Sequence, residues 1–391
     1  MYQVLLFALL AFCSVSRGFA RHSSSGTVTP SPTLPAPSPS STCPPPAPPP
    51  SGVQCLSPYP GSPLDCGWLN FINCNETTTP SSNKRFPPKH CHGKVPEPWP
   101  TVGPLSFPSD LDTGYGHKMT PLQIYSILSL VWVAENGPGP FTGVVPWYNA
   151  YGYIQNIGDG RGYTTNIVGF CSGTGDLPVF LNKLRRLEPC NPLVQYLPDV
   201  RALSAANSPE LTGLEGFAAK VVEQAGGPSG SGPINPNYIK ATWNTLSDKS
   251  SDSGYWGRAM DASRKYHLGL PISKGQLYDI VLNSGNLSIL KNVSAVVKPP
   301  TKKQSGGDQE LRFLAELQNQ WLKVITTSMS LDDGQPDRAL MWQHLAFPNT
   351  TNVGTDGQPG ANNTVPNLDL SLPLTVRCYS ANYNIQAPSS D

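Results

Sequence analysis

The chain of 391 residues carries 27 basic and 26 acidic side chains, and only 14% of its residues are charged. This balance argues against nucleic-acid binding and against adhesion to an acidic surface. The 43 prolines indicate a long extended segment, and the nine cysteines indicate an oxidising compartment. The rest of the chain is long enough to form one sizeable hydrophobic core.

Residues 1–20 have the pattern of a secretory signal peptide. An apolar run covers Val4–Phe12, and Gly18 and Ala20 take the small-residue positions before a cleavage site. A short membrane anchor is the alternative, but this run is too short to cross a bilayer. The sequence therefore predicts a secreted protein, located outside the cell or in the cell wall, with no membrane attachment.

Residues 21–52 form a low-complexity linker of Ser, Thr and Pro, with proline runs within Cys43–Pro50. Such a composition cannot bury a core, and the prolines favour an extended polyproline II spacer. The segment resembles the hydroxyproline-rich glycoproteins of cell walls, which carry sugars on Ser, Thr or hydroxyproline. A plain disordered linker is the other interpretation.

Residues 53–104 are a cysteine-rich extension or small module. Once the signal peptide with Cys13 is removed, eight cysteines remain: Cys43, Cys55, Cys66, Cys74, Cys91, Cys171, Cys190 and Cys378. An even number in a secreted protein predicts disulfide bonds, whose pairing the sequence leaves open. The triplet His90-Cys91-His92 suggests a metal site, but a paired cysteine between surface histidines suits an oxidising compartment better.

The same segment contains aromatic residues that could stack on sugar rings: Tyr59, Trp68, Phe71 and Trp99. A small carbohydrate-binding module is one interpretation of these aromatic residues. A disulfide-tied extension that packs on the main domain is an equally good interpretation.

Residues 105–391 are predicted to form one domain that is mostly helical. Apolar residues recur at helical spacing in the segments Leu177–Leu187, Leu214–Gln224, Tyr255–Tyr266, Gly275–Leu282 and Leu311–Ile325. Glycosylation sequons, typical of the surface loops of secreted proteins, begin at Asn75, Asn286, Asn292, Asn349 and Asn362.

One further helix is predicted to end in a carboxylate. The sequence Thr120-Pro121-Leu122-Gln123 combines a capping box with proline at the first helical position. The apolar residues of the buried face follow at helical spacing: Ile124, Ile127, Leu128 and Val131. Gly137 and Pro138 end the helix, so Glu135 lies in its last turn. The negative end of the helix dipole and the apolar neighbours would raise the pKa of Glu135.

A second carboxylate, Asp159, precedes Gly160 between the β-prone runs Tyr151–Ile157 and Tyr163–Phe170. An Asp-Gly pair in this setting favours a primed hairpin turn, and the adjacent Arg161 would keep the carboxylate charged. One acid with a raised pKa and one held ionised form the pattern of an acid and base pair. Two acids on different elements are also what hydrolysis of a glycosidic bond requires. Taken alone, each of these residues is more often structural.

The stretch from Ala134 to Asp176 resembles the signature of glycoside hydrolase family 46, the chitosanases. The matching pieces are Ala134-Glu135-Asn136, Tyr151-Gly152-Tyr153, Ile157-Gly158-Asp159-Gly160-Arg161-Gly162-Tyr163-Thr164 and Gly169-Phe170-Cys171-Ser172-Gly173-Thr174-Gly175-Asp176. The likeness continues through Leu187-Glu188-Pro189 and Tyr196-Leu197-Pro198. Weaker likeness, at Tyr278-Asp279 and Asn367-Leu368-Asp369-Leu370, extends the resemblance to the range from Thr120 to Cys378. The resemblance implies a mainly α fold with a small β-hairpin sheet (α+β), in two lysozyme-like lobes with a substrate cleft between them.

The resemblance also implies roles for individual residues. Glu135 falls where the family has its general acid, Asp159 where it has the general base of an inverting hydrolysis, and Thr164 where a hydroxyl orients the attacking water. Cleft positions that hold the sugar or orient the carboxylates correspond to Tyr153, Arg161 and Asp176. An ion network behind the acid corresponds to Asp279 and Arg338, but the second arginine expected near Gln320-Trp321 is missing.

Chitosan carries protonated amines, so a protein that binds it needs exposed acids along the cleft. Asp112, Asp159 and Asp176 are candidates. Gln155 and Asn156 stand where the family often has acids, which predicts a weaker grip on amines and better tolerance of acetylated units.

The leading hypothesis is a secreted, monomeric, endo-acting chitosanase that needs neither cofactor nor metal. A wall-associated lectin-like protein without turnover is the alternative from another class, and a hydrolase of chitin or peptidoglycan is the third.

Overall fold

The computed structural model describes residues 103–136, 140–156, 160–225, 234–328, 335–354 and 357–389. The expected signal peptide, the proline-rich linker and almost all of the cysteine-rich segment 53–104 lie outside these ranges. Within them, no helix is both long enough and apolar enough to cross a membrane.

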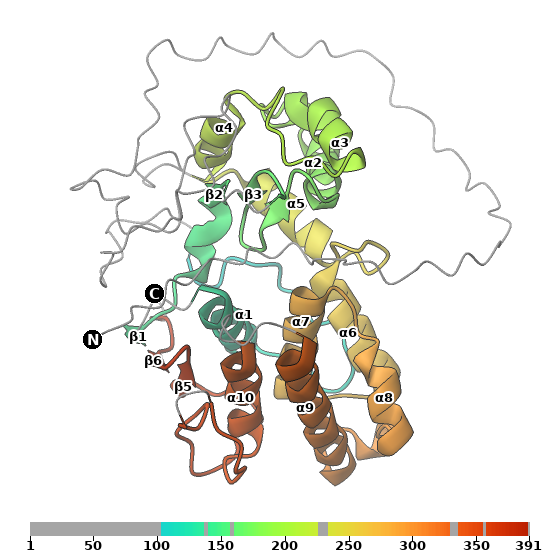
Figure 1. Cartoon of the computed structure of the whole chain (residues 1–391), viewed down its shortest axis with the longest axis vertical. Coiled ribbons are helices and arrows are strands. Elements are labelled where there is room, and N and C mark those ends of the chain that lie inside the picture. Colours follow the sequence, from blue (N-terminus) through green and yellow to red (C-terminus); the bar gives the residue numbers. More distant parts are fainter. Residues whose placement is uncertain are drawn as a thin grey trace, which may run out of the picture.

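The described residues form two groups of helices, each with a small sheet (Figure 1). The upper lobe contains α2 (Asp176–Leu187), α3 (Leu197–Ala205), α4 (Phe217–Gln224), α5 (Pro236–Leu246) and the three-stranded sheet of β2 (Ile154–Gln155), β3 (Thr164–Thr165) and β4 (Phe170–Cys171). The lower lobe contains α1 (Pro121–Asn136), α6 (Tyr255–Tyr266), α7 (Pro271–Ser284), α8 (Ile289–Val296), α9 (Asp308–Ser328) and α10 (Gln335–Ala346). Its three-stranded sheet has the order β1 (Phe141–Gly143), β6 (Ala381–Ile385), β5 (Leu374–Cys378). The predicted mainly helical class is therefore confirmed.

Helix α1 begins where its sequence predicts. Gln123 Oε1 accepts a hydrogen bond from the backbone N–H of Thr120 at 2.8 Å, and Thr120 Oγ1 accepts one from the N–H of Gln123 at 3.2 Å. These are the two reciprocal bonds of a capping box. The predicted face is buried, and so are Leu130, Val133 and Ala134 on other sides of the helix. Because α1 is enclosed almost all round, its last turn delivers Glu135 into the protein interior.

The predicted helices differ from the observed ones mainly in extent. The structure has α6 with the predicted bounds, whereas α4 begins three residues later than expected, after Gly216 with φ of +80°. Helices α3, α5, α8 and α10 were not predicted. In α10 every side chain from residue 336 to residue 346 is buried, so no polar face gives the helical period on which the prediction relied.

The predicted hairpin is present in shortened form. Strand β2 (Ile154–Gln155) pairs antiparallel with β3 (Thr164–Thr165), with Ile154 opposite Thr165 and Gln155 opposite Thr164. Gly160 has φ of +88°, a conformation that favours glycine. Asp159 lies outside the described residues.

The strands on either side of the turn are shorter than the two runs that were predicted. Residues Trp147–Gly152 form a short 3-10 helix, η1, which takes up the first two residues of one run. The other run is divided by a turn, since Asn166 has φ of +72° and its side chain accepts a hydrogen bond from the N–H of Ile167. Strand β4 (Phe170–Cys171) follows this turn and pairs with β3. The β-branched and aromatic composition of these runs did not reveal that Asn166 ends the strand.

The sheet of the lower lobe was not predicted. Strands β5 (Leu374–Cys378) and β6 (Ala381–Ile385) form an antiparallel hairpin, and β1 (Phe141–Gly143) pairs parallel with β6. Since β1 follows α1 closely in sequence, this sheet places the C-terminal hairpin beside the end of α1 (Figure 1).

The expectation that all eight cysteines pair is wrong for Cys378. Its thiol is free and fully buried at the end of β5. The side chain faces the core as the last inward position of an alternating strand, so it serves as an apolar packing residue there.

Candidate active site

Glu135 lies in the last turn of α1, with only 7% of its side chain exposed. Its Oε1 forms an ion pair with Nη1 of Arg338. Burial raises the pKa of Glu135 from 4.5 to about 7, the charge of Asp279 acts in the same direction, and Arg338 and Arg161 oppose both. Burial outweighs the guanidinium groups here. The result is a carboxyl group that keeps its proton at pH values below about 7, which a general acid needs.

Arg338, near the start of α10, connects Glu135 to Asp279 of α7. Its Nη2 donates to Asp279 Oδ1 at 2.7 Å, and its Nε lies 3.0 and 3.1 Å from the two oxygens of the same carboxylate. Both side chains are completely buried. Because this carboxylate holds the planar guanidinium along the edge formed by Nε and Nη2, the guanidinium presents Nη1 to Glu135 in one orientation.

The second arginine of the expected network has no counterpart at the predicted place. Trp321 is buried there, and Gln320 donates a hydrogen bond to Glu316 on its own helix. Arg338 therefore pairs with both Glu135 and Asp279. The charge of Arg161 also acts on Glu135. Asp279 pushes the pKa of Glu135 upward, whereas the two arginines lower it.

Two residues of the β2-β3-β4 region lie in buried positions. Thr164 on β3 is completely buried, and its Oγ1 lies 3.4 Å from Sγ of Cys171. Arg161 is 8% exposed, and its positive charge acts on Glu135. The structure therefore brings Arg161 close enough to the acid for electrostatic interaction. Asp159 lies outside the described residues, so its position relative to Glu135, Arg161 and Thr164 is not described.

Tyr153 lies between η1 and β2 and is buried. Its carbonyl oxygen accepts hydrogen bonds from the N–H of Asn166 at 2.9 Å and from Oγ1 of Thr165 at 2.8 Å. These bonds fix the backbone at the start of the hairpin.

Asp176 occupies the first turn of α2 and is half-buried. Its Oδ1 accepts a hydrogen bond from Oγ of Ser253 at 2.8 Å. Burial raises the pKa of Asp176 from 3.8 to about 6, and the hydrogen bonds from Ser253 and Thr174 counteract part of this rise. The sequence did not single out Ser253, which precedes α6 and is 77 residues away in the chain.

Asp112 is not the exposed acid that was predicted. Its carboxylate is 5% exposed and forms an ion pair with the fully buried Lys274 of α7, with Oδ2 and Nζ 2.8 Å apart. The backbone N–H groups of Met119 and Gly114 also donate to it, at 2.6 and 3.1 Å. Asp112 thus anchors the segment before α1, and a buried ion-paired carboxylate cannot attract an amine from solvent.

Tyr379 is a neighbour of the acid that sequence reasoning missed. Its hydroxyl donates a hydrogen bond to the carbonyl oxygen of Ala134, the residue before Glu135. The two residues are 245 positions apart, and a tyrosine before a serine carries no sequence signal for such a contact.

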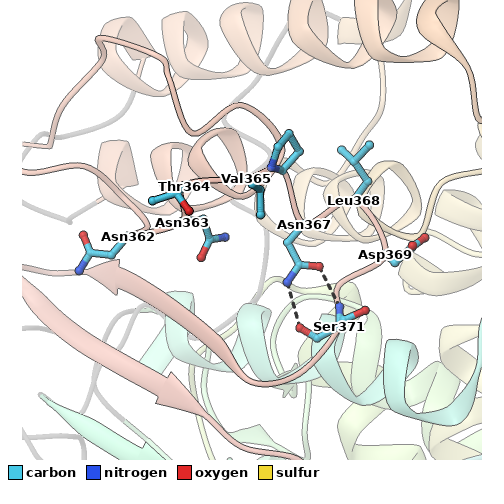
Figure 2. A pocket seen from close by; sticks show the side chains of 9 residues that line it. Asn362, Asn363, Thr364, Val365, Asn367, Leu368, Asp369 and Ser371 are labelled. Carbon is cyan, nitrogen blue, oxygen red and sulfur yellow. Dashed lines mark hydrogen bonds between the residues drawn. The ribbon is translucent and has the colours of Figure 1, made fainter.

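A surface pocket of about 460 Å³ lies elsewhere, in the loop between α10 and β5 (Figure 2). It is lined by residues 362–369 and Ser371, and two hydrogen bonds of 2.9 Å between Asn367 and Ser371 close one side. The weakly matching stretch Asn367–Leu370 falls here. Neither Glu135 nor any other predicted site residue lines this pocket, so it is separate from the candidate site.

One protein family matches this chain over more than half its length. The model of Glycosyl hydrolase family 46 matches residues 129–340. A chitosanase of Bacillus subtilis (strain 168) is 29% identical over 160 residues, which are 41% of this chain and 53% of that protein. A chitosanase of Streptomyces sp. (strain N174) is 43% identical over 81 residues, which are 21% of this chain and 27% of that protein. The chain thus matches about half, or less, of the length of these curated relatives.

A native chitosanase from Bacillus subtilis MY002 has a similar solved structure. Its TM-score to this chain is 0.50 at 21% sequence identity, with 69% of this chain and 100% of that chain covered. At this identity the likeness concerns the fold alone. It confirms the predicted mainly α, lysozyme-like arrangement.

Proposed function

Because this chain belongs to glycosyl hydrolase family 46, we propose that it is a secreted, endo-acting chitosanase that cleaves β-1,4 bonds between glucosamine units. The observation that carries the proposal is the state of Glu135. A buried carboxyl group with a pKa of about 7, held by Arg338 at the end of a buried helix, has the properties of a proton donor below neutral pH.

In the proposed reaction, Glu135 gives its proton to the glycosidic oxygen as the bond to the anomeric carbon breaks. Asp159 removes a proton from a water molecule that attacks the opposite face of the sugar, and the Thr164 hydroxyl orients that water. The product has the inverted anomeric configuration. Inverting enzymes leave room for the water by holding the two carboxyl groups roughly 6.5–9.5 Å apart.

Asp176 and Arg161 have complementary tasks in this proposal. A half-buried carboxylate at position 176 would attract a glucosamine amine, and Arg161 would orient the carboxylates through its charge. Gln155 and Asn156 carry no charge on the same hairpin. The proposed substrate range therefore includes partly acetylated chitosan.

The proposal is tested with soluble chitosans of several degrees of acetylation, by following viscosity and the release of reducing ends. A fast fall in viscosity with few new ends indicates endo cleavage, and proton NMR of the first products reports the anomer. Glu135→Gln should abolish turnover while oligosaccharide binding persists. Glu223→Gln on α4, a surface glutamate with 43% of its side chain exposed, is the matched control and should keep full activity.

Three outcomes would change the proposal. Binding without cleavage at any pH from about 4 to about 7 would indicate the lectin-like alternative. Cleavage of chitin or peptidoglycan in place of chitosan would keep the hydrolase and replace the substrate. Full activity of Glu135→Gln would exclude Glu135 as the proton donor.

A further inference from the structure

The last turn of α1 has a hydrogen-bonding requirement that its own helix cannot meet. The final carbonyl groups of any α-helix lack N–H partners within the helix, and Ala134 is two residues from the end of α1. Ala134 is also fully buried, so bulk water does not reach its surroundings. The hydroxyl of Tyr379 donates to this carbonyl oxygen. The side chain of a residue near the C-terminal end of the fold thus completes the helix end that carries Glu135.

Tyr379 reaches this position through an unfavourable backbone conformation. It forms the two-residue turn between β5 and β6 together with Ser380, and their φ angles are +49° and +59°. Such a primed turn favours Asn-Gly, because positive φ is costly for bulky residues. A tyrosine at this place opposes the local preference. Backbone strain of this kind is found where a side chain must point in one particular direction.

The turn is also connected to the ion pair of the acid. The N–H of Ser380 lies 3.4 Å from Oδ2 of Asp337, which is buried in the first turn of α10. The next residue along α10 is Arg338, which pairs with Glu135. Asp337 of α10 therefore contacts the turn, and its neighbour Arg338 contacts Glu135. Tyr379 connects the turn directly to α1.

We propose that Tyr379 is a positioning residue for Glu135: its hydroxyl fixes the last turn of α1 and thereby the direction in which the acid presents its proton. This inference rests on the proposed function. Burial and nearby negative charges, including that of Glu135, hold the pKa of Tyr379 well above its usual range, so the hydroxyl remains a donor at every working pH.

Removing this donor has an electrostatic consequence with a definite sign. Without the O–H dipole, the carbonyl oxygen of Ala134 presents an uncompensated partial negative charge next to Glu135. That charge disfavours the ionised acid, so the pKa of Glu135 rises further. A variant that lacks the hydroxyl should therefore show a displaced pH profile as well as a lower rate.

The experiment compares Tyr379→Phe, Tyr379→Asn and Ser380→Gly with the wild type. Tyr379→Phe keeps the ring and loses the hydroxyl. We expect kcat to fall about tenfold or more, with KM within about twofold, because small errors in the position of a reacting group reduce rates strongly. The basic limb of its pH profile should move to higher pH. Ser380→Gly relieves the neighbouring backbone, keeps the N–H bonded to Asp337, and should retain wild-type activity and pH profile.

Tyr379→Asn separates function from stability. Asparagine suits the turn better than tyrosine, so the thermal midpoint should remain within a few degrees of wild type, while kcat falls as in the phenylalanine variant. If both variants lose stability in proportion to activity and their pH profiles stay in place, Tyr379 has a structural role only and the inference is wrong. Wild-type rates in both variants would also overturn it.

A second readout does not depend on turnover. The pH dependence of unfolding reports the pKa of Glu135 in each background, and Tyr379→Phe should displace it upward. Inactivity of the wild type on chitosan would refute the proposed function, whereas an unchanged pH dependence in Tyr379→Phe would refute the positioning role.

Discussion

Replacing Glu135 with Gln should change how the stability of the protein depends on pH. Burial raises the pKa of Glu135 from 4.5 to about 7 in the folded protein. Below the unfolded pKa the carboxyl group is protonated in both states and ionisation has no effect on stability. As the pH rises through the window between the two values, the unfolded chain ionises first, so the folded protein loses stability until its own pKa is passed.

The size of this loss follows from the two pKa values. Each pH unit between them corresponds to 1.36 kcal/mol, so the full change from 4.5 to about 7 amounts to about 3 kcal/mol. Glutamine cannot ionise and does not show the loss. The free energy of unfolding of the variant, minus that of the wild type, should therefore increase by about 3 kcal/mol between about pH 4 and about pH 8.

Urea denaturation followed by tryptophan fluorescence at several pH values measures this difference. Any constant effect of the substitution, such as the altered contact with Arg338, cancels because only the change with pH is read. Glu223→Gln on the surface of α4 is the control, and its difference from wild type should stay within about 0.5 kcal/mol throughout. A difference that is flat with pH for Glu135→Gln would mean that burial does not raise the pKa of the acid, and the argument for a proton donor would lose its basis.

Three other substitutions test separate parts of the fold and site. Lys274→Met leaves the buried carboxylate of Asp112 without its cation and should lower the free energy of unfolding, measured by urea denaturation, by about 3–5 kcal/mol. Adding Asp112→Asn should restore part of this stability, and no recovery would contradict the ion-pair argument. Gly275→Ala places a methyl group 2.8 Å from a ring carbon of Trp342 and should lower the free energy of unfolding by about 1–3 kcal/mol, seen as a lower thermal midpoint. An unchanged midpoint would show that the neighbouring side chains can move to make room for the methyl group. Because the pKa of Asp176 is about 6, its charge is lost as the pH falls through that value. In the inactive Glu135→Gln protein, which leaves glucosamine oligomers intact, calorimetry should give an affinity ratio between pH 7 and pH 5 that becomes smaller when Asp176→Asn is added, because the amines of the ligand titrate in the same way in both proteins; equal ratios would remove Asp176 from the binding site.

The helix that carries Glu135 could be predicted because all its signals are local. The capping box of Thr120 and Gln123, the apolar spacing and the terminating Gly137-Pro138 lie within one short stretch, and each acts on its immediate neighbours. The raised pKa of Glu135 was also predicted in direction, although its main cause is burial by parts of the chain that are distant in sequence.

Other parts could not be predicted because their determinants are not local. Helix α10 is buried on all sides and shows no amphipathic period, so only the resemblance singled out Arg338 in it. The turn at Tyr379 and Ser380 lacks the Asn-Gly signal that marks its conformation in sequences. Asp112 reads as a solvated acid until Lys274, 162 residues later, is placed against it.

The parallel pairing of β1 with β6 has a consequence for synthesis of the protein. Residues Phe141–Gly143, made soon after Glu135, have to wait for Tyr383–Ile385 before their strand partner exists. During translation the strand after α1 therefore has no partner until residues 383–385 have been made and have left the ribosome. Contacts between residues that are distant in sequence slow folding, so we expect the newly made chain to reach its native structure late.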